Sequence, residues 1–176
     1  MNHKLNTLPD HRLERLREQG FVGLSDVKLT SLAFGIRFAY WLCSFFLIIA
    51  IIAANVYLLI LLMLIALATV ILPYHPFDYI YNHSLRYKLG KPKLPPRGNQ
   101  IKFSCGLAAL WMGFTAFFFY HHMMGAGYLA GLSLIIVALT VSITDFCIPS
   151  QLYNIIFRFD TRKKRENVVK SKYPQS

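Results

Sequence analysis

The most constraining feature of the sequence is a run of forty residues, Phe38 to Phe77, that contains no Asp, Glu, Lys or Arg. About 20 apolar residues in a helix are enough to cross the hydrocarbon core of a bilayer, so the run is long enough for two passes. Asn55 is the one strongly polar side chain before Pro73. We therefore expect transmembrane helices at about residues 31–54 and 56–72, joined by a tight turn at the membrane surface, where backbone groups can be hydrated. A hairpin that enters the bilayer without crossing it is the alternative, because the second helix is short.

A second uncharged run extends from Phe103 to Thr144 and is interrupted at Met124-Gly125-Ala126-Gly127. Two glycines so close together favour a turn over a helix interior. This pattern predicts a third and a fourth helix at about residues 103–123 and 128–144. The expected fold class is all-α: a membrane protein of four transmembrane helices, arranged as two antiparallel hairpins, with short interfacial helices.

The distribution of charge predicts the orientation. The 176-residue chain is 55% hydrophobic and yet has a net charge of +11. All nineteen Lys and Arg fall in three segments: the N-terminal arm with the start of the first helix, the connection Arg86–Lys102, and the tail from Arg158. A four-helix path places these segments on one side, which the positive-inside rule identifies as cytoplasmic. We therefore expect a bacterial cytoplasmic (inner) membrane protein with both termini inside, whose charge requires no nucleic-acid partner.

The segments outside the predicted spans have their own patterns. Residues 1–30 are expected to form a cytoplasmic arm with a short helix, residues 31–159 the transmembrane domain, and residues 160–176 a basic tail attracted to anionic lipid headgroups. Apolar residues at helical spacing predict interfacial amphipathic helices at about residues 76–89 and 150–159. Asp78 is expected to cap or flank the first of these.

One candidate metal site is the cluster His121-His122-Met123-Met124 at the predicted outer turn. Imidazole and thioether groups are ligands that copper accepts. However, consecutive residues on a helix point about 100° apart, which works against convergence on one ion. The other interpretation is that these histidines and methionines only face the membrane interface. No cofactor is predicted, and copper is kept as an alternative.

Two further sets of residues lie near the predicted cytoplasmic ends of the helices. Asp145 is costly at membrane depth without a partner, and Arg37 at similar depth is expected to form an ion pair with it between the first and fourth helices. Cys43, Cys105 and Cys147 each lie near the cytoplasmic end of a different helix and would form a possible thiol site if the bundle brings them together, with His75 as a further member. The alternative is that the cysteines are small apolar packing residues.

The chain from about Leu32 to Phe159 resembles a bacterial integral membrane family known as domain of unknown function 4395. The resemblance rests on the overall layout, on the stretch Lys93-Leu94-Pro95-Pro96 and on the segment from Phe146 to Tyr153. The family has Phe-Cys-x-x-Cys-x-x-Tyr in that segment, and here Ser150 replaces the second cysteine. The resemblance implies that any dithiol chemistry of the family's cysteine pair is lost in this chain.

These observations favour a non-catalytic membrane protein over an enzyme. We expect an accessory, assembly or stabilising subunit of a larger membrane complex, such as an energy-transducing one, with other integral membrane subunits and lipid as partners. One alternative is a metal- or thiol-handling protein that uses the His-Met cluster or the cysteines. A small oligomeric transporter is the third possible function, although the predicted helices carry few polar groups.

Overall fold

The structure is a computed structural model that describes residues 7–157, and this part of the chain contains helices and no strand. In chain order the elements are α1 (Asp10–Glu18), α2 (Asp26–Ile52), α3 (Val56–Ile71), α4 (Pro76–Ile80), the π-helical segment η1 (Tyr81–Leu85), α5 (Arg86–Leu89), α6 (Asn99–Tyr120), α7 (Met124–Thr144) and α8 (Ile148–Ile156). The predicted basic tail, residues 160–176, lies outside the described residues.

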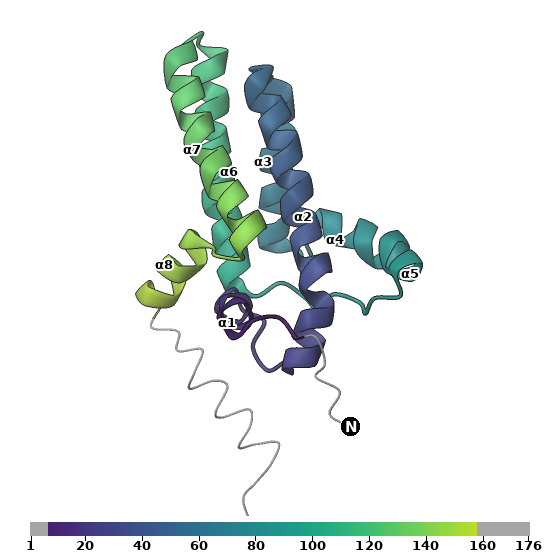
Figure 1. The fold of residues 1–176 in the computed structure, drawn as a ribbon. Coiled ribbons are helices and arrows are strands. Elements are labelled where there is room, and N and C mark those ends of the chain that lie inside the picture. The colour runs from purple at the N-terminus through teal and green to yellow at the C-terminus, as the bar shows by residue number, and fades with distance from the viewer. Residues whose placement is uncertain (1–6, 158–176) are drawn as a thin grey trace, which may run out of the picture.

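The long helices α2, α3, α6 and α7 lie side by side, and the short helices gather at one end of them (Figure 1). We call this end, which carries α1, α4, α5 and α8, the base. Among the long helices, α3 packs most closely against α6, and α2 packs against α7. The short turns that join α2 to α3 and α6 to α7 lie at the opposite end (Figure 1).

Several of the long helices can cross a membrane. By length and composition, α2, α6 and α7 each qualify. The 16-residue α3 qualifies only together with the segment Pro76–Leu89, from which it is bent by 78°. The chain is therefore a multi-pass membrane protein with three or four candidate membrane-spanning helices.

The ends of α2 and α3 are fixed by polar caps. The Ser25 hydroxyl accepts a hydrogen bond from the Lys28 backbone N–H, and α2 begins at Asp26, before the transmembrane part that was expected from about residue 31. The first turn of α2 contains Asp26 and Lys28, so the helix extends beyond its apolar part. In the turn before α3, the Asn55 side chain accepts from the Leu58 backbone N–H at 3.0 Å.

The turn between α6 and α7 differs from the expected one. It occupies residues 121–123, and His122 adopts a left-handed backbone with φ of +59°. Gly125 and Gly127 belong to the first turn of α7. A Cβ atom at Gly127 would lie 2.6 Å from the Phe119 ring. Gly127 therefore serves close contact between the two helices and not chain reversal.

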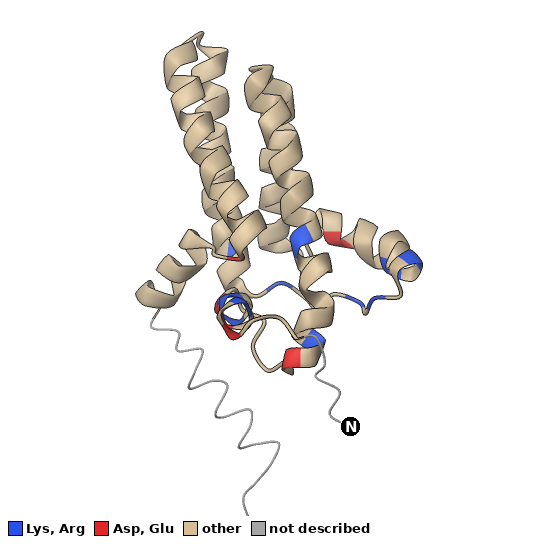
Figure 2. Ribbon diagram, in the orientation of Figure 1, with Lys and Arg blue, Asp and Glu red and all other residues tan. Residues whose placement is uncertain are grey.

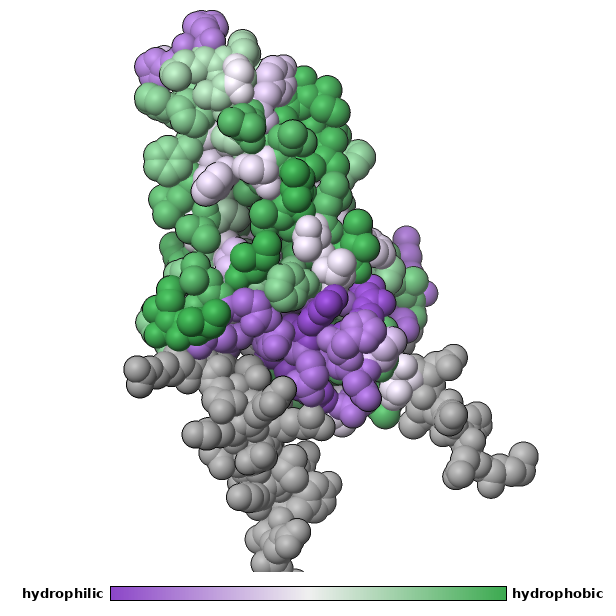
Figure 3. Space-filling view, turned by 60° about the vertical axis from the view of Figure 1, so that its left-hand side comes forward, coloured by the Kyte–Doolittle hydropathy of each residue, from purple (hydrophilic) through white to green (hydrophobic). Residues whose placement is uncertain are grey.

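The base differs in chemistry from the long helices. In Figure 2, the Lys, Arg, Asp and Glu residues of the described part of the chain are gathered at the base. On the face shown in Figure 3, most of the surface of the long helices is hydrophobic and much of the base is hydrophilic, while a small hydrophilic patch lies at the tip opposite the base. The base nevertheless has an apolar core of its own, which includes Leu16, Leu29, Leu32, Tyr81 and Leu94. This core holds α1 and the connection after α5 against α2.

Candidate functional site

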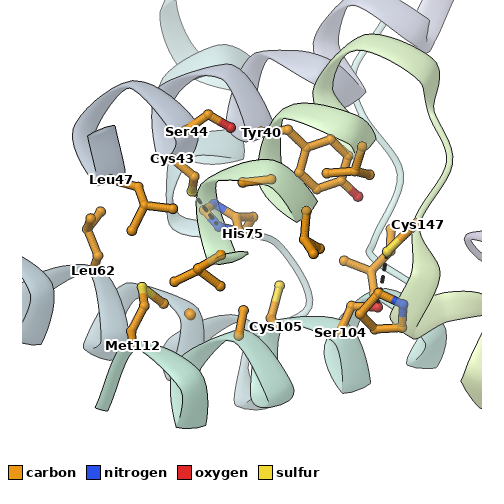
Figure 4. A pocket seen from close by; sticks show the side chains of 18 residues that line it. Tyr40, Cys43, Ser44, Leu47, Leu62, His75, Ser104, Cys105, Met112 and Cys147 are labelled. Carbon is orange, nitrogen blue, oxygen red and sulfur yellow. Dashed lines mark hydrogen bonds between the residues drawn. The ribbon is translucent and has the colours of Figure 1, made fainter. Parts of the chain in front are cut away.

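A cavity of about 140 Å³ lies among the four long helices towards the base (Figure 4). All four long helices contribute side chains to it. The lining includes Cys43 of α2, Cys105 of α6 and Cys147 between α7 and α8. The structure therefore brings the three sequence-predicted cysteines around one cavity, together with His75.

His75 forms the polar end of the cavity beside Cys43. Its Nε2 lies 3.6 Å from the Cys43 Sγ, and its Nδ1 accepts the backbone N–H of Phe77 at 3.2 Å. Because a backbone N–H can only donate, Nδ1 carries no proton, and the proton of the neutral imidazole is on Nε2. His75 thus caps α4 with one ring nitrogen and presents an N–H donor to the cavity with the other.

The other polar groups of the cavity bond to neighbouring side chains. The Cys147 thiol donates to the Ser104 hydroxyl at 3.4 Å, and the hydroxyls of Ser104 and Ser150 are 3.0 Å apart. The Tyr40 hydroxyl donates to the Gln19 side chain at 3.0 Å. Ser150, which replaces the second cysteine of the motif, is therefore part of a hydrogen-bonded chain that reaches Cys147.

The described residues contain no group of three or more His, Cys, Asp and Glu side chains arranged to hold a metal ion. All three cysteines are free thiols and partly buried. In this arrangement the cysteines line one cavity.

The His-Met cluster lies at the other end of the molecule, in the turn between α6 and α7. His121 ends α6 and contacts the Phe117 ring, with 4.4 Å between ring centroids. His122, Met123 and Met124 are exposed at the turn, and both methionines are more than two-fifths exposed. The cluster and the cysteines therefore lie at opposite ends of the long helices.

Arg37 and Asp145 are in contact, as their matching predicted depth suggested. The Arg37 Nε donates to Asp145 Oδ1 at 2.5 Å, and its Nη2 donates to the other carboxylate oxygen. The Arg12 Nε donates to the same carboxylate at 2.9 Å. Arg12 lies 133 residues before Asp145 in the chain, and no sequence pattern linked the two.

The Asp145 site also binds the N-terminal helix through backbone groups. The Gln19 side chain donates to the Asp145 carbonyl at 2.6 Å, and Arg15 donates to the Thr144 carbonyl at 2.8 Å. Burial raises the pKa of Asp145 above its ordinary value, while the hydrogen bond and charge of Arg12 and the charge of Arg15 oppose the shift. The end of α7 is thus joined to α1 and α2 at one point.

A second buried ion pair joins Asp78 to Arg97. The guanidinium donates to the two carboxylate oxygens at 2.7 and 2.6 Å and to the Ile36 carbonyl at 3.3 Å. Burial alone would lower the pKa of Arg97, but the charge and hydrogen bond of Asp78 outweigh it and raise the pKa. Asp78 also accepts the backbone N–H of His75, as its predicted capping role requires. The pairing with Arg97 was not anticipated, although both residues lie between the two uncharged runs.

An apolar groove of about 580 Å³ runs along the outside of α3 and α6. Met63 and Leu67 of α3 form one side, and several aromatic residues of α6 line the other: Phe114, Phe117 and Phe118. Between them lie Ala109 and Gly113, which are four residues apart and so share a face of α6.

Comparison with known proteins gives the family of the chain. No curated protein and no solved structure matches it. The family described as a domain of unknown function (DUF4395) matches residues 33–158, which extend from α2 to the residue after the described part of the chain. The chain belongs to this family.

Proposed function

We propose that this chain is a non-catalytic accessory subunit that assembles with, or stabilises, a larger complex in the bacterial cytoplasmic membrane. In this proposal α2, α3, α6 and α7 all cross the bilayer as two antiparallel hairpins. The base and both termini face the cytoplasm, as the positive-inside rule requires. The partner is another integral membrane subunit, and an energy-transducing complex is the kind of assembly that we favour.

The observation that carries the proposal is the groove between α3 and α6. Apolar surface alone does not drive helices together in lipid, because lipid tails are equally apolar. Close approach of helix backbones at small residues does drive association, and the partly exposed Gly113 supplies such a position in the groove, whereas Ala109 is 1% exposed and packs within the chain. The groove therefore suits a transmembrane helix of a partner better than a disordered acyl chain.

The paired charges of the base support a structural role. Asp78 and Asp145 are at most 1% exposed, and each carboxylate binds at least one guanidinium from a distant part of the chain. These groups hold the base together at the level where the membrane ends. Basic residues on the surface of the base, such as Lys88 and Lys91, would additionally attract anionic lipid headgroups.

Native purification with a groove variant tests the proposal. Gly113→Leu places a large side chain in the groove, where a Cβ atom meets only the flexible Met63 side chain at 3.4 Å. Gly125→Leu is the matched control, because a Cβ atom there has no neighbour within 4 Å. We expect a specific membrane subunit to co-purify with the wild type and with Gly125→Leu, and to be lost with Gly113→Leu.

Three results would overturn the proposal. The first is a wild-type protein that purifies without any stable membrane partner after gentle extraction from its native membrane. The second is a partner that binds Gly113→Leu as well as the wild type, which would remove the groove from the interface. Self-association that depends on Gly113 would instead identify a second copy as the occupant and would contradict the accessory role.

A further inference from the structure

The central cavity exists because small side chains face it. Ser44, Ala66, Ala108 and Ala138 line it, one from each long helix. Elsewhere in the bundle, small residues have the opposite effect. At Gly131 a Cβ atom would lie 2.5 Å from the Ile51 side chain, so that space is already filled. The helices therefore close fully at Gly131 and leave a defined space around the cysteines.

The size of the cavity corresponds to one ring. An enclosed apolar cavity of ~150 Å³ in another protein stays dry and binds benzene. The cavity here measures about 140 Å³ and has a lining of aliphatic side chains and thiols. Thiol sulfur is polarizable and makes favourable contacts with aromatic rings.

The electrostatics of the cavity exclude a charged occupant. Its lining contains no Asp, Glu, Lys or Arg within the described part of the chain. The nearest ionised groups of the base are already paired, Arg97 with Asp78 and Arg37 with Asp145. An ion in the cavity would lose its hydration without gaining a free counter-charge.

The polar end of the cavity offers a hydrogen-bond donor. The His75 Nε2–H has only the Cys43 sulfur, a weak acceptor, within reach at 3.6 Å. In contrast, the hydroxyls of Ser44 and Tyr40 are engaged with Ser142 and Gln19. A ligand oxygen near His75 would be a stronger acceptor than the thiol.

We infer that the cavity binds an uncharged, ring-sized molecule that carries an acceptor oxygen, with the ring between Cys43, Cys105 and Leu62 and the oxygen towards His75. This inference is separate from the accessory role, because the cavity and the groove on α3 and α6 share no lining residue. The ligand is either a free small molecule or the ring of a membrane-dissolved lipid.

Binding of two matched probes tests the inference. Acetophenone and ethylbenzene are similar in size, but only the first has an acceptor oxygen. We expect both to bind the full-length protein in nanodiscs with a stoichiometry of one, measured by equilibrium dialysis against empty nanodiscs. Acetophenone should bind about fivefold more tightly, which is the ratio that one hydrogen bond of typical strength gives.

Variants locate the binding. Ala138→Phe and the smaller Ala138→Leu should fill the cavity and abolish saturable binding of both probes, while Ala126→Leu, in the first turn of the same helix and outside the lining, should not. His75→Ser keeps a hydroxyl that can cap α4 and removes the ring N–H from the cavity. It should remove the preference for acetophenone and leave ethylbenzene binding unchanged.

Three results would overturn the inference. The first is that the probes partition into protein-containing nanodiscs no more than into empty ones, and the second is that saturable binding survives in both Ala138 variants. The third is that the purified protein contains a stoichiometric soft metal that Cys105→Ser removes. If the probes bind, organic extraction of the protein distinguishes the sources. A stoichiometric ring-bearing lipid in the extract identifies a membrane lipid as the ligand, and its absence identifies a free small molecule.

The Gly113→Leu variant separates this inference from the accessory role, because Gly113 lies outside the cavity. If Gly113→Leu loses the accessory partner and binds the probes as the wild type does, the two proposals are independent.

Discussion

At the scale of single residues, Asp145 organises the base. It ends α7 in a left-handed backbone conformation with φ of +59°, and its side chain is almost fully buried. Its carboxylate binds two guanidinium groups, Arg12 from α1 and Arg37 from α2. A buried carboxylate without these partners would be strongly unfavourable, and the two arginines depend on it in turn.

Replacing Asp145 by Asn tests this dependence. Asn tolerates the left-handed backbone, so Asp145→Asn changes the charge and keeps the conformation. Because two partly buried guanidinium groups lose their counter-ion, we expect the free energy of unfolding in detergent to fall by about 3 kcal/mol. Asp10→Asn, at an exposed acid in the first turn of α1, is the control and should change stability by less than about 1 kcal/mol. Equal effects of the two substitutions would contradict this role of Asp145.

At the scale of elements, the connection after α5 is held to the base by Arg97. Its backbone N–H donates to the Pro73 carbonyl at 2.8 Å, and its guanidinium binds Asp78 and the Ile36 carbonyl. Leu94 of the same connection is buried, and its backbone N–H donates to the Asn82 side chain at 2.9 Å. A proline-rich segment without regular hydrogen bonds thus becomes an ordered part of the fold.

Limited proteolysis tests the role of Arg97. Lys93 is an exposed trypsin site within this connection, whereas Lys91 precedes Pro92 and trypsin does not cleave that bond. Arg97→Gln removes the ion pair, so we expect the connection to open more often and cleavage after Lys93 to accelerate about tenfold. Lys88→Gln, an exposed change in α5, should leave the cleavage rate after Lys93 unchanged. Cleavage of Arg97→Gln at the wild-type rate would show that apolar packing alone holds the segment.

At the scale of the whole molecule, charge and hydropathy divide the protein into two parts. The long helices present apolar side chains, and the charged side chains of the described residues lie at the base (Figures 2 and 3). This division is what a bilayer requires, because charged groups are costly within its hydrocarbon core. It predicts that the turns between α2 and α3 and between α6 and α7 lie together on the side of the membrane opposite the base.

Cysteine labelling tests the orientation. In a background with Cys43, Cys105 and Cys147 replaced by Ala or Ser, we would introduce Tyr57→Cys or Gly125→Cys near the two turns, and Lys91→Cys at the base. A membrane-impermeant maleimide added to spheroplasts should label the first two variants and leave the third unlabelled. Inverted membrane vesicles should give the reverse pattern. Labelling of Tyr57→Cys and Gly125→Cys from opposite sides would exclude a four-span path.

The sequence alone determined the features that depend on composition and local pattern. Two long uncharged runs can be stable only in lipid or in a much larger core, so the helical, multi-pass character followed directly from them. Family membership could also be seen from the residues around Cys147. The pairing of Arg37 with Asp145 could be anticipated because each is costly at membrane depth and few partners are available there.

Only the tertiary structure decided which distant residues meet. Helix packing placed Cys43, Cys105 and Cys147 around one cavity, because their positions relative to one another depend on helix spacing and rotation. The same packing assigned Gly127 to a contact with Phe119 and brought Arg12 to Asp145 across 133 residues. Such contacts leave no mark in the hydropathy pattern, since they depend on how whole helices dock and not on the residues next to them in the chain.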